Sequence, residues 1–260
     1  MPHEFDLTGR VAVVTGGNGG IGLGMARSLA AAGASVAIWG RNPDKNREAA
    51  AELSGSGGTV ESFACDVTDR AAIEEAFAAT LARFGRVDGM FANAGVSSRS
   101  RHSFADRPSE EWRSMFDTNL HGVVDTLQVA ARHMRERAAA GDPYGRLVAT
   151  SSVASIAGAA FNEHYGATKG ALNALIRAIA VELARHGITA NAILPGWIES
   201  DMTADLLAND KFVGNVLPRI PARRFGKPSD FGGMAVYLMS GASAYTTGQV
   251  FVIDGGYTIY

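Results

Sequence analysis

Short apolar runs alternate with longer stretches of helical spacing along the whole chain. The first run, Val11 to Val14, is continuously apolar, which is typical of a strand buried on both faces. Residues 21–32 follow with apolar side chains at helical spacing, and Gly33 suits the position after a helix. Further strands are predicted over residues 35–39, 59–64, 89–92, 146–151, 188–194 and 250–253.

Helices are predicted in the stretches between these strands. Their ranges are residues 44–53, 71–84, 109–139, 165–186 and 228–239. Gly122 lies inside the longest of them and predicts a bend there. Seven strands alternating with about six helices predict an α/β fold, in which a doubly wound seven-stranded parallel sheet carries helices on both faces.

We expect one domain over residues 1–260, since no linker or repeat interrupts the pattern. Residues 197–224 depart from the alternation, and this segment is predicted to be an insertion that contacts the substrate. Its apolar side chains would either line a pocket or pack a short helix onto the body. Arg219, Arg223 and Arg224 near its end would meet an acidic or carrier-linked substrate, or form a solvated charged cluster.

Composition and charge exclude several classes of protein. The net charge of -2 gives no electrostatic reason to expect nucleic acid or a membrane as partner. No apolar run approaches the ~20 residues that span a bilayer, and the N-terminus does not resemble a secretory signal. The single cysteine, Cys65, lies in an apolar run and is expected to be buried. No histidine pair has the spacing of a zinc site, so we expect no metal. Without a predicted secretory signal or membrane span, we expect a cytoplasmic protein.

A glycine-rich loop, from Thr15 to Gly24, joins the first predicted strand to the first predicted helix. Glycine lets backbone amides approach a pyrophosphate, and the helix N-terminus adds partial positive charge. Two dinucleotide-binding spacings fit this loop, one through Gly17, Gly19 and Gly22 and the other through Gly16, Gly20 and Gly22. The position between strand and helix favours dinucleotide binding over a merely flexible loop.

The end of the second predicted strand bears on which dinucleotide is bound. The chain there reads Gly40-Arg41-Asn42, with no carboxylate to accept the two ribose hydroxyls. Arginine suits a 2′-phosphate, so the sequence favours NADP over NAD. Arg41 could equally be a solvated loop charge, and Asp44 could partly serve a ribose from several residues further on.

Tyr165 and Lys169 are four residues apart and would share one face of a helix. A nearby cation can lower the pKa of a phenol from ~10, which would make Tyr165 a usable acid or base near neutral pH. Taken alone, the same pair also fits an exposed amphipathic face.

With these residues the chain resembles the short-chain dehydrogenase/reductase family over nearly its whole length, which implies a Rossmann-like fold. The matching features are the loop glycines Gly16, Gly20 and Gly22, then Asp66, Asn93-Ala94-Gly95, Asn119, Ser152 thirteen residues before Tyr165, Lys169, and Pro195-Gly196. They occur in the family's order and on the expected elements.

The resemblance implies a role for each catalytic residue. Tyr165 would exchange a proton with the reacting oxygen, and Ser152 would hydrogen-bond that oxygen, with Ser151 as an adjacent competitor. Lys169 would bind the nicotinamide ribose and favour the ionised tyrosine, and Asn119 would hold a water that relays protons. The implied cofactor-binding residues are Gly16, Asn18, Gly19, Gly20, Ile21, Gly22, Arg41, Asn42, Asp66, Val67, Asn93, Ala94, Gly95, Tyr165, Lys169, Pro195, Gly196 and Ile198.

The function that follows is reversible hydride transfer between NADP(H) or NAD(H) and a ketone or secondary alcohol of small size. The alternatives are a nucleotide-binding sensor without turnover and a reductase of carrier-linked 3-oxoacyl thioesters. Enoyl reduction is disfavoured, because relatives with that activity resemble a wider Tyr-to-Lys spacing. Polar residues 97–102 and 161–164 flank the expected site and indicate a substrate with hydroxyls. The resemblance also implies a homo-oligomer, a tetramer or dimer, with the C-terminus at a subunit contact.

Overall fold

The structure, a computed structural model, describes residues 4–98, 100 and 102–260. Its centre is one parallel sheet of seven strands in the order β3-β2-β1-β4-β5-β6-β7. The strands are β1 (Val11–Thr15), β2 (Ser35–Gly40), β3 (Val60–Ala64), β4 (Gly89–Ala92), β5 (Gly145–Thr150), β6 (Ile188–Pro195) and β7 (Val250–Ile253). All seven predicted strands are confirmed. The strand order reverses between β1 and β4, which makes the sheet doubly wound.

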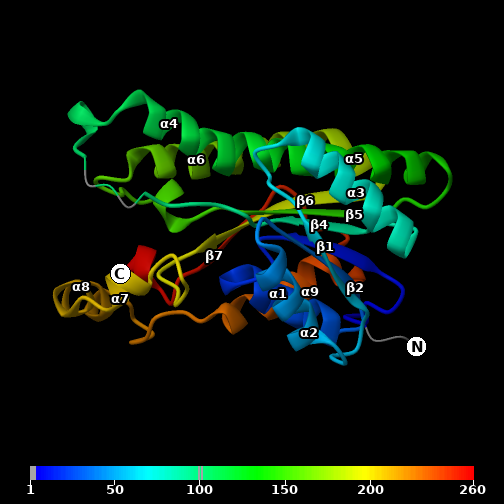
Figure 1. Cartoon of the computed structure of the whole chain (residues 1–260), viewed down its shortest axis with the longest axis horizontal. Coiled ribbons are helices and arrows are strands. Elements are labelled where there is room, and N and C mark those ends of the chain that lie inside the picture. The colour runs from blue at the N-terminus through cyan, green and yellow to red at the C-terminus, as the bar shows by residue number, and fades with distance from the viewer. Residues whose placement is uncertain (1–3, 99, 101) are drawn as a thin grey trace.

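Helices cover both faces of this sheet (Figure 1). They are α1 (Gly20–Ala31), α2 (Pro43–Leu53), α3 (Arg70–Phe84), α4 (Ser109–Phe116), α5 (Gly122–Ala139), α6 (Glu163–Leu183), α7 (Ala204–Leu207), α8 (Asp210–Val216) and α9 (Gly232–Met239). Helices α3 to α6 lie over one face, and α1, α2 and α9 lie over the other. None of the helices within the described residues is long and apolar enough to cross a membrane.

The alternation of side chains along each strand divides the core into two layers. Val13 of β1 and Trp39 of β2 pack with the layer that includes α3, α5 and α6. Their neighbours Val14 and Ile38 pack with the layer beneath α1 and α9. Because both faces of the strands are covered, the strand sequences are apolar at nearly every position.

The helical stretch predicted over residues 109–139 is confirmed, and it consists of two α-helices with an irregular turn between them. A π-helical turn over Asp117–His121 separates α4 from α5. The π-helical turn ends directly before Gly122, where a bend was predicted, and Gly122 itself has ordinary helical angles. Glycine is needed there for packing, because a Cβ would lie 2.6 Å from the carbonyl oxygen of Val67.

Two other predicted helices have different ends in the structure. The helix predicted over residues 165–186 begins earlier, at Glu163, and its last turn over Ala184–His186 is a 3₁₀-helix closed by Gly187 with φ 70°. The helix predicted over residues 228–239 opens with a 3₁₀ turn over Pro228–Phe231 before α9. The earlier start of α6 places Tyr165 within its first turn.

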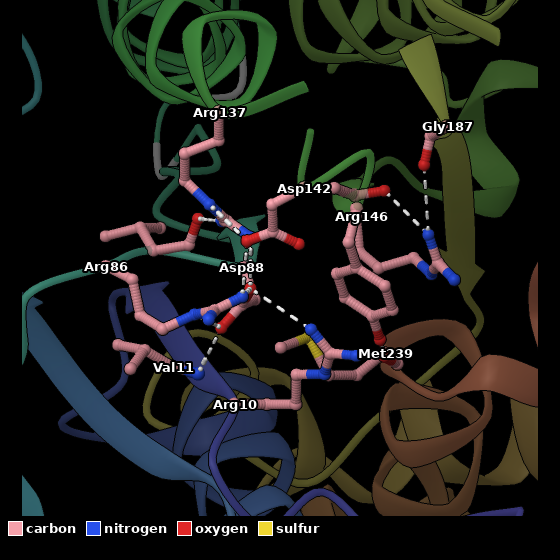
Figure 2. Close-up of polar contacts among 12 residues, drawn as sticks. Arg10, Val11, Arg86, Asp88, Arg137, Asp142, Arg146, Gly187 and Met239 are labelled. Carbon is pink, nitrogen blue, oxygen red and sulfur yellow. Dashed lines mark hydrogen bonds and ion pairs between the residues drawn. The ribbon is translucent and has the colours of Figure 1, made fainter. Parts of the chain in front are cut away.

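A buried carboxylate joins strands at the amino end of the sheet (Figure 2). Asp88, just before β4, is fully buried and accepts hydrogen bonds from the Val11 amide at 2.9 Å and from Arg86 Nη2 at 2.6 Å. Arg137 Nη2 of α5 approaches the same carboxylate at 2.9 Å, and Arg10 Nη1 at 3.5 Å. These contacts fix the amino ends of β1 and β4, so the loops at the opposite, carboxyl ends are left free to form a site.

Candidate active site

The predicted site residues meet at the carboxyl edge of the sheet, where parallel α/β proteins bind their ligands. The glycine-rich loop follows β1, Asn93 follows β4, Ser152 follows β5, and Gly196 follows β6. Helix α6 brings two further predicted residues, Tyr165 and Lys169, to the same edge. Among the residues that the structure describes, no group of three or more His, Cys, Asp or Glu side chains could hold a metal ion.

The conformation of the glycine-rich loop distinguishes the two glycine spacings. Gly16 and Gly20 have left-handed φ angles of 63° and 51°, which favour glycine. A Cβ on Gly22 would lie 2.2 Å from the carbonyl oxygen of Gly16, so a side chain has no room there. Gly19 is extended and would have open space around a Cβ. The structure therefore requires glycine at all three positions of the spacing through Gly16, Gly20 and Gly22.

The start of α1 fits the pyrophosphate of a dinucleotide. Its N-cap, Gly19, has no side chain to bind the first amides, and the first turn contains no acidic residue. Unpaired amides and the positive end of a twelve-residue helix together attract an anion. The loop glycines keep side chains out of the approach to these amides.

Two asparagines fill the space at the end of β2. A Cβ on Gly40 would lie 2.4 Å from Asn46 Oδ1 and 2.5 Å from Asn18 Nδ2. Asn46 of α2 is buried; it donates hydrogen bonds to the carbonyl oxygens of Gly40 and Phe63, and accepts one of 2.6 Å from Asn18. No carboxylate side chain fits at this strand end. The sequence reasoning missed Asn46, whose only signal was an asparagine on the buried face of a helix.

Asp66, Asn42 and Val67 lie near the carboxyl ends of β2 and β3. Asp66 Oδ1 accepts hydrogen bonds from the amide and hydroxyl of Thr68, at 2.9 and 2.8 Å. Burial alone would raise the pKa of Asp66, but these bonds and the charge of Arg41 lower it overall. The Asn42 side chain caps α2 by accepting bonds from two amides of its first turn. Val67 is buried after β3.

Asn93 joins the carboxyl ends of three strands. Its amide and that of Ala94 both donate to Thr15 Oγ1 at 2.9 Å, and its Nδ2 donates to the Thr15 carbonyl oxygen at 3.0 Å. Thr150 Oγ1 of β5 donates to Asn93 Oδ1 at 3.1 Å. The side chain is therefore engaged within the protein, where it aligns β1, β4 and β5.

The two adjacent serines after β5 have different partners. The Ser151 hydroxyl is buried and donates to the Lys169 carbonyl oxygen at 2.8 Å. Ser152 lies beside the Tyr165 hydroxyl, whose pKa it lowers, and its Oγ accepts a hydrogen bond from the Ala154 amide at 3.1 Å. The geometry therefore separates the competitors: Ser151 fixes α6, and Ser152 lies at the tyrosine.

Lys169 is buried, and its Nζ donates to the Thr150 carbonyl oxygen at 2.7 Å. Burial lowers the pKa of Lys169 to about 8. Burial also raises the pKa of Tyr165, and the neighbouring Ser152 offsets this rise only in part. The net shift of the Tyr165 pKa is upward, opposite to the expectation, because desolvation outweighs any effect of the Lys169 ammonium, whose Nζ lies 5.6 Å from the ring centroid.

Asn119 lies in the π-helical turn and is fully buried. Its Oδ1 accepts from the Val96 amide and its Nδ2 donates to the Val96 carbonyl oxygen, both at 2.8 Å, while Nδ2 also contacts Met115 Sδ. A Cβ on Gly95 would lie 3.1 Å from Asn119 Oδ1 and 3.5 Å from Lys169 Nζ. The side chain thus holds the loop after β4, and a water relay would have to use its main chain.

The segment after β6 closes the other side of the site. Gly196 packs so tightly that a Cβ would lie 2.8 Å from the Asp254 Cα, and Ile198 is buried. Ser200 then passes over the glycine-rich loop, its Cβ 3.5 Å from a Cβ built on Gly20. Next to it, Asp201 forms an ion pair of 2.8 Å with Lys45 of α2. This pair connects α2 to the segment after β6.

The predicted insertion, residues 197–224, folds as two short helices, α7 and α8, beside the C-terminus (Figure 1). The Trp197 ring lies 5.0 Å from that of Phe212 and 6.4 Å from that of Tyr257, so these aromatic residues pack the segment onto the body. Its arginines have partners within the chain. Arg219 stacks on Tyr257, Arg223 donates to the Pro218 carbonyl oxygen, and Arg224 pairs with Asp230.

Fold and site together define a nicotinamide-dependent oxidoreductase of the doubly wound type. A family model described as enoyl-(acyl carrier protein) reductase matches residues 16–258. A short-chain type dehydrogenase/reductase from Mycobacterium marinum is 36% identical, with 99% of this chain and 98% of that chain covered and a TM-score of 0.91. The chain belongs to the short-chain dehydrogenase/reductase family.

Similar curated proteins are dehydrogenases and reductases of the same length. L-rhamnose 1-dehydrogenase (NAD(P)(+)) from Azotobacter vinelandii is 35% identical, with 96% of this chain and 97% of the relative covered. Gluconate 5-dehydrogenase from Gluconobacter oxydans is also 35% identical, with 99% and 98% covered. A 3-oxoacyl-[acyl-carrier-protein] reductase from Chlamydia pneumoniae is 33% identical, with 98% and 99% covered.

A solved structure adds the cofactor. That of a candidate NAD(P)-dependent gluconate 5-dehydrogenase from Beutenbergia cavernae, with NADP bound at low occupancy, is 35% identical with a TM-score of 0.91. The match covers 99% of this chain and 100% of that chain. The predicted activity is confirmed at this level: the protein is an NAD(P)-dependent oxidoreductase of ketones and secondary alcohols.

Proposed function

We propose that Tyr165 is the general acid and base of the reaction and that Ser152 and Lys169 support it. The observation that carries this assignment is the position of the Tyr165 hydroxyl beside Ser152, with Lys169 buried one helical turn further on. In carbonyl reduction the Tyr165 hydroxyl donates its proton to the carbonyl oxygen, and Ser152 donates a hydrogen bond to the same oxygen. Alcohol oxidation follows the reverse path.

The nicotinamide, when bound, supplies the hydride in reduction and accepts it in oxidation. Lys169, as an ammonium, stabilises the ionised Tyr165 that remains after proton donation. Asn119 keeps the loop after β4 against Lys169, and a water at its main chain relays the proton that restores Tyr165. We propose that the cofactor-binding residues predicted from the sequence bind the dinucleotide. Asn93 and Asn42 contribute indirectly, because Asn93 aligns the strands and Asn42 caps α2.

We assign NADP as the preferred cofactor. Arg41 follows β2 and suits a 2′-phosphate, and the asparagines beside Gly40 leave no room for the carboxylate that would accept two ribose hydroxyls. Lys45 adds a second cation on α2, shared in this structure with Asp201.

We assign a polyhydroxylated substrate, a sugar or sugar acid, bound under residues 197–224. The support is the polar character of the segments beside Tyr165, where Asn162 Nδ2 donates to Ser97 Oγ at 3.0 Å, together with the substrates that the names of two relatives state. A 3-oxoacyl thioester is the second candidate, favoured by the 33% identical reductase. The internal contacts of Arg219, Arg223 and Arg224 argue against a carrier-binding patch.

We further propose a cytoplasmic homo-oligomer. The edge strand β7 carries the exposed Val252, and the C-terminal Ile259 and Tyr260 are also exposed, which leaves an apolar surface for a second copy. A single buried, free cysteine is consistent with a reducing compartment.

The test combines cofactor titration with turnover. NADPH should bind more tightly than NADH. The protein should oxidise gluconate or L-rhamnose with NADP, and it should not reduce a 3-oxoacyl thioester with NADPH. Tyr165→Phe should keep NADPH binding within about twofold and lose about 10²- to 10⁴-fold in kcat. Tyr245→Phe, at an exposed tyrosine, is the matched control and should change neither. Full turnover by Tyr165→Phe would move the acid to another residue.

A further inference from the structure

A buried arginine connects the two segments that flank Tyr165. Arg107 lies between β4 and α4, and its side chain is wholly buried. Within its own region it donates to Ser100 Oγ at 3.0 Å, to the His102 carbonyl oxygen at 2.9 Å and to Glu111 Oε2 at 2.5 Å. Its Nη2 also donates to the carbonyl oxygen of Phe161, before α6, at 2.7 Å. One guanidinium thus joins the segment after β4 to the loop after β5.

The backbone of Phe161 is strained at the point that Arg107 holds. Its φ of 62° lies in the left-handed region, which is unfavourable for a residue other than glycine. The ring is half exposed, so packing of the side chain does not explain the conformation. The peptide groups do: the Phe161 amide donates to Glu163 Oε1 at 2.9 Å, and its carbonyl oxygen accepts from Arg107.

This conformation determines how α6 begins. Asn162 is the N-cap of α6, and the Gly166 amide donates to its carbonyl oxygen at 3.0 Å. Tyr165 lies between these two residues, in the first turn. The Asn162 side chain also reaches Ser97, in the segment on the other side of the site, at 3.0 Å. A change of backbone angles at Phe161 would therefore move both Tyr165 and the polar pair beside it.

We propose that Arg107 is a positioning residue, which holds Phe161 in the left-handed conformation and thereby fixes the first turn of α6, with Tyr165, against the segment after β4. Arg107 acts through Phe161, since its own side chain has no exposed surface. Arginine suits the position because its fork of donors serves a carboxylate, a hydroxyl and two carbonyl oxygens at once, which a lysine ammonium cannot do. The effect on turnover rests on the proposed role of Tyr165.

Arg107→Met should raise KM for the sugar substrate and lower kcat, together by about tenfold or more in kcat/KM, because small misplacements of reacting groups are costly. NADPH binding should stay within about twofold, since the loop after β1 does not contact Arg107. Arg107→Lys, which keeps the charge without the fork, should show an intermediate loss and covers the case in which the methionine variant folds poorly. Arg113→Met, at an exposed arginine of α4 that pairs with Glu110 across one turn, is the control and should behave as the parent.

The decisive variant combines Arg107→Met with Phe161→Gly. Glycine adopts a positive φ without steric cost, so the double variant should recover most of the kcat/KM that Arg107→Met loses. Phe161→Gly alone should be close to the parent protein. Persistence of the full loss in the double variant, or turnover by Arg107→Met within twofold of the parent, overturns the proposal.

A second readout does not depend on the substrate. Hydrogen exchange of the amides in residues 159–169, measured in the NADPH complex, should be faster in Arg107→Met and slow again in the double variant. Unchanged exchange in Arg107→Met also overturns the proposal. If the parent protein oxidises none of the sugars tested, the assigned substrate fails, whereas the exchange data still decide the role of Arg107.

Discussion

Asn46 Oδ1 accepts a hydrogen bond of 2.6 Å from Asn18 Nδ2, directly beside the last residue of β2. The contact joins α2 to the glycine-rich loop and occupies the space in which a side chain at Gly40 would lie. The sequence shows only that a carboxylate is missing at the end of β2. In the structure this space is filled by the two asparagines, one of which belongs to the loop that we propose to bind the pyrophosphate.

Gly40→Ala should weaken both NADPH and NADH binding severalfold, because the added methyl group displaces Asn18. The same variant should lose roughly 1–3 kcal/mol of unfolding free energy through overpacking. Gly40→Asp should be at least as unstable and should not switch the preference to NADH. Titration of both cofactors and denaturant unfolding measure these effects.

Gly233→Ala provides the matched control for this substitution. Gly233 lies in α9 with no atom within 4 Å of a built Cβ, so alanine should stabilise the protein by about 0.4–1 kcal/mol. A Gly40→Ala protein with normal stability and normal binding of both cofactors would show that the asparagine pair yields without consequence.

The buried Lys169 makes the stability of the protein depend on pH. Its pKa falls from the ordinary 10.5 to about 8 on folding, so the unfolded chain binds more protons between these values. Its contribution is therefore unfavourable below pH 8 and is relieved as the pH rises toward 10.5. With the Lys169 pKa lowered from 10.5 to about 8 on folding, this group alone should add about 2 kcal/mol to the unfolding free energy between pH 7 and pH 9.5.

Lys169→Met should remove that rise, which urea unfolding at the two pH values would measure. The variant should also lose turnover, because the proposed stabilisation of ionised Tyr165 goes with the ammonium. Lys211→Met, at an exposed lysine of α8, should keep the slope of the parent protein. An equal slope in the parent and in Lys169→Met would place the pKa of Lys169 in the folded protein near its ordinary value.

The ion pair between Lys45 and Asp201 is expected to slow the release of the cofactor, because it connects α2 to the segment that passes over the glycine-rich loop. Asp201→Asn should raise the NADPH dissociation rate severalfold in stopped-flow measurements, and high salt should reduce the difference, since both side chains are exposed. Exchanging the charges with Lys45→Asp and Asp201→Lys together should restore the parent's dissociation rate for NADH, which has no 2′-phosphate for Lys45 to meet.

Glu74→Gln supplies the comparison for Asp201→Asn. It removes the same charge from an exposed pair with Arg70 that lies within one helix, and it should leave the NADPH dissociation rate unchanged. Equal rates for the parent, Asp201→Asn and the exchanged pair would mean that the bridge does not control release.

Local patterns in the sequence determined the strands, the doubly wound arrangement and the edge at which the site forms. Val11 to Val14 predicted a buried strand because both faces of a parallel sheet are covered, and the spacing of Tyr165 and Lys169 placed them on one helix face. The family resemblance then selected Ser152. These are properties of neighbouring residues, or of motifs whose order is visible in the chain.

Only the tertiary structure decided what fills the space around those residues. Asn46 reaches Gly40 from a helix, Ser151 turns to the Lys169 carbonyl while Ser152 meets Tyr165, and Arg107 reaches across to Phe161. The pKa of Tyr165 moved opposite to the expectation for the same reason. Desolvation and steric fit depend on the atoms that distant segments bring together, and the spacing of residues along one helix carries no information about them.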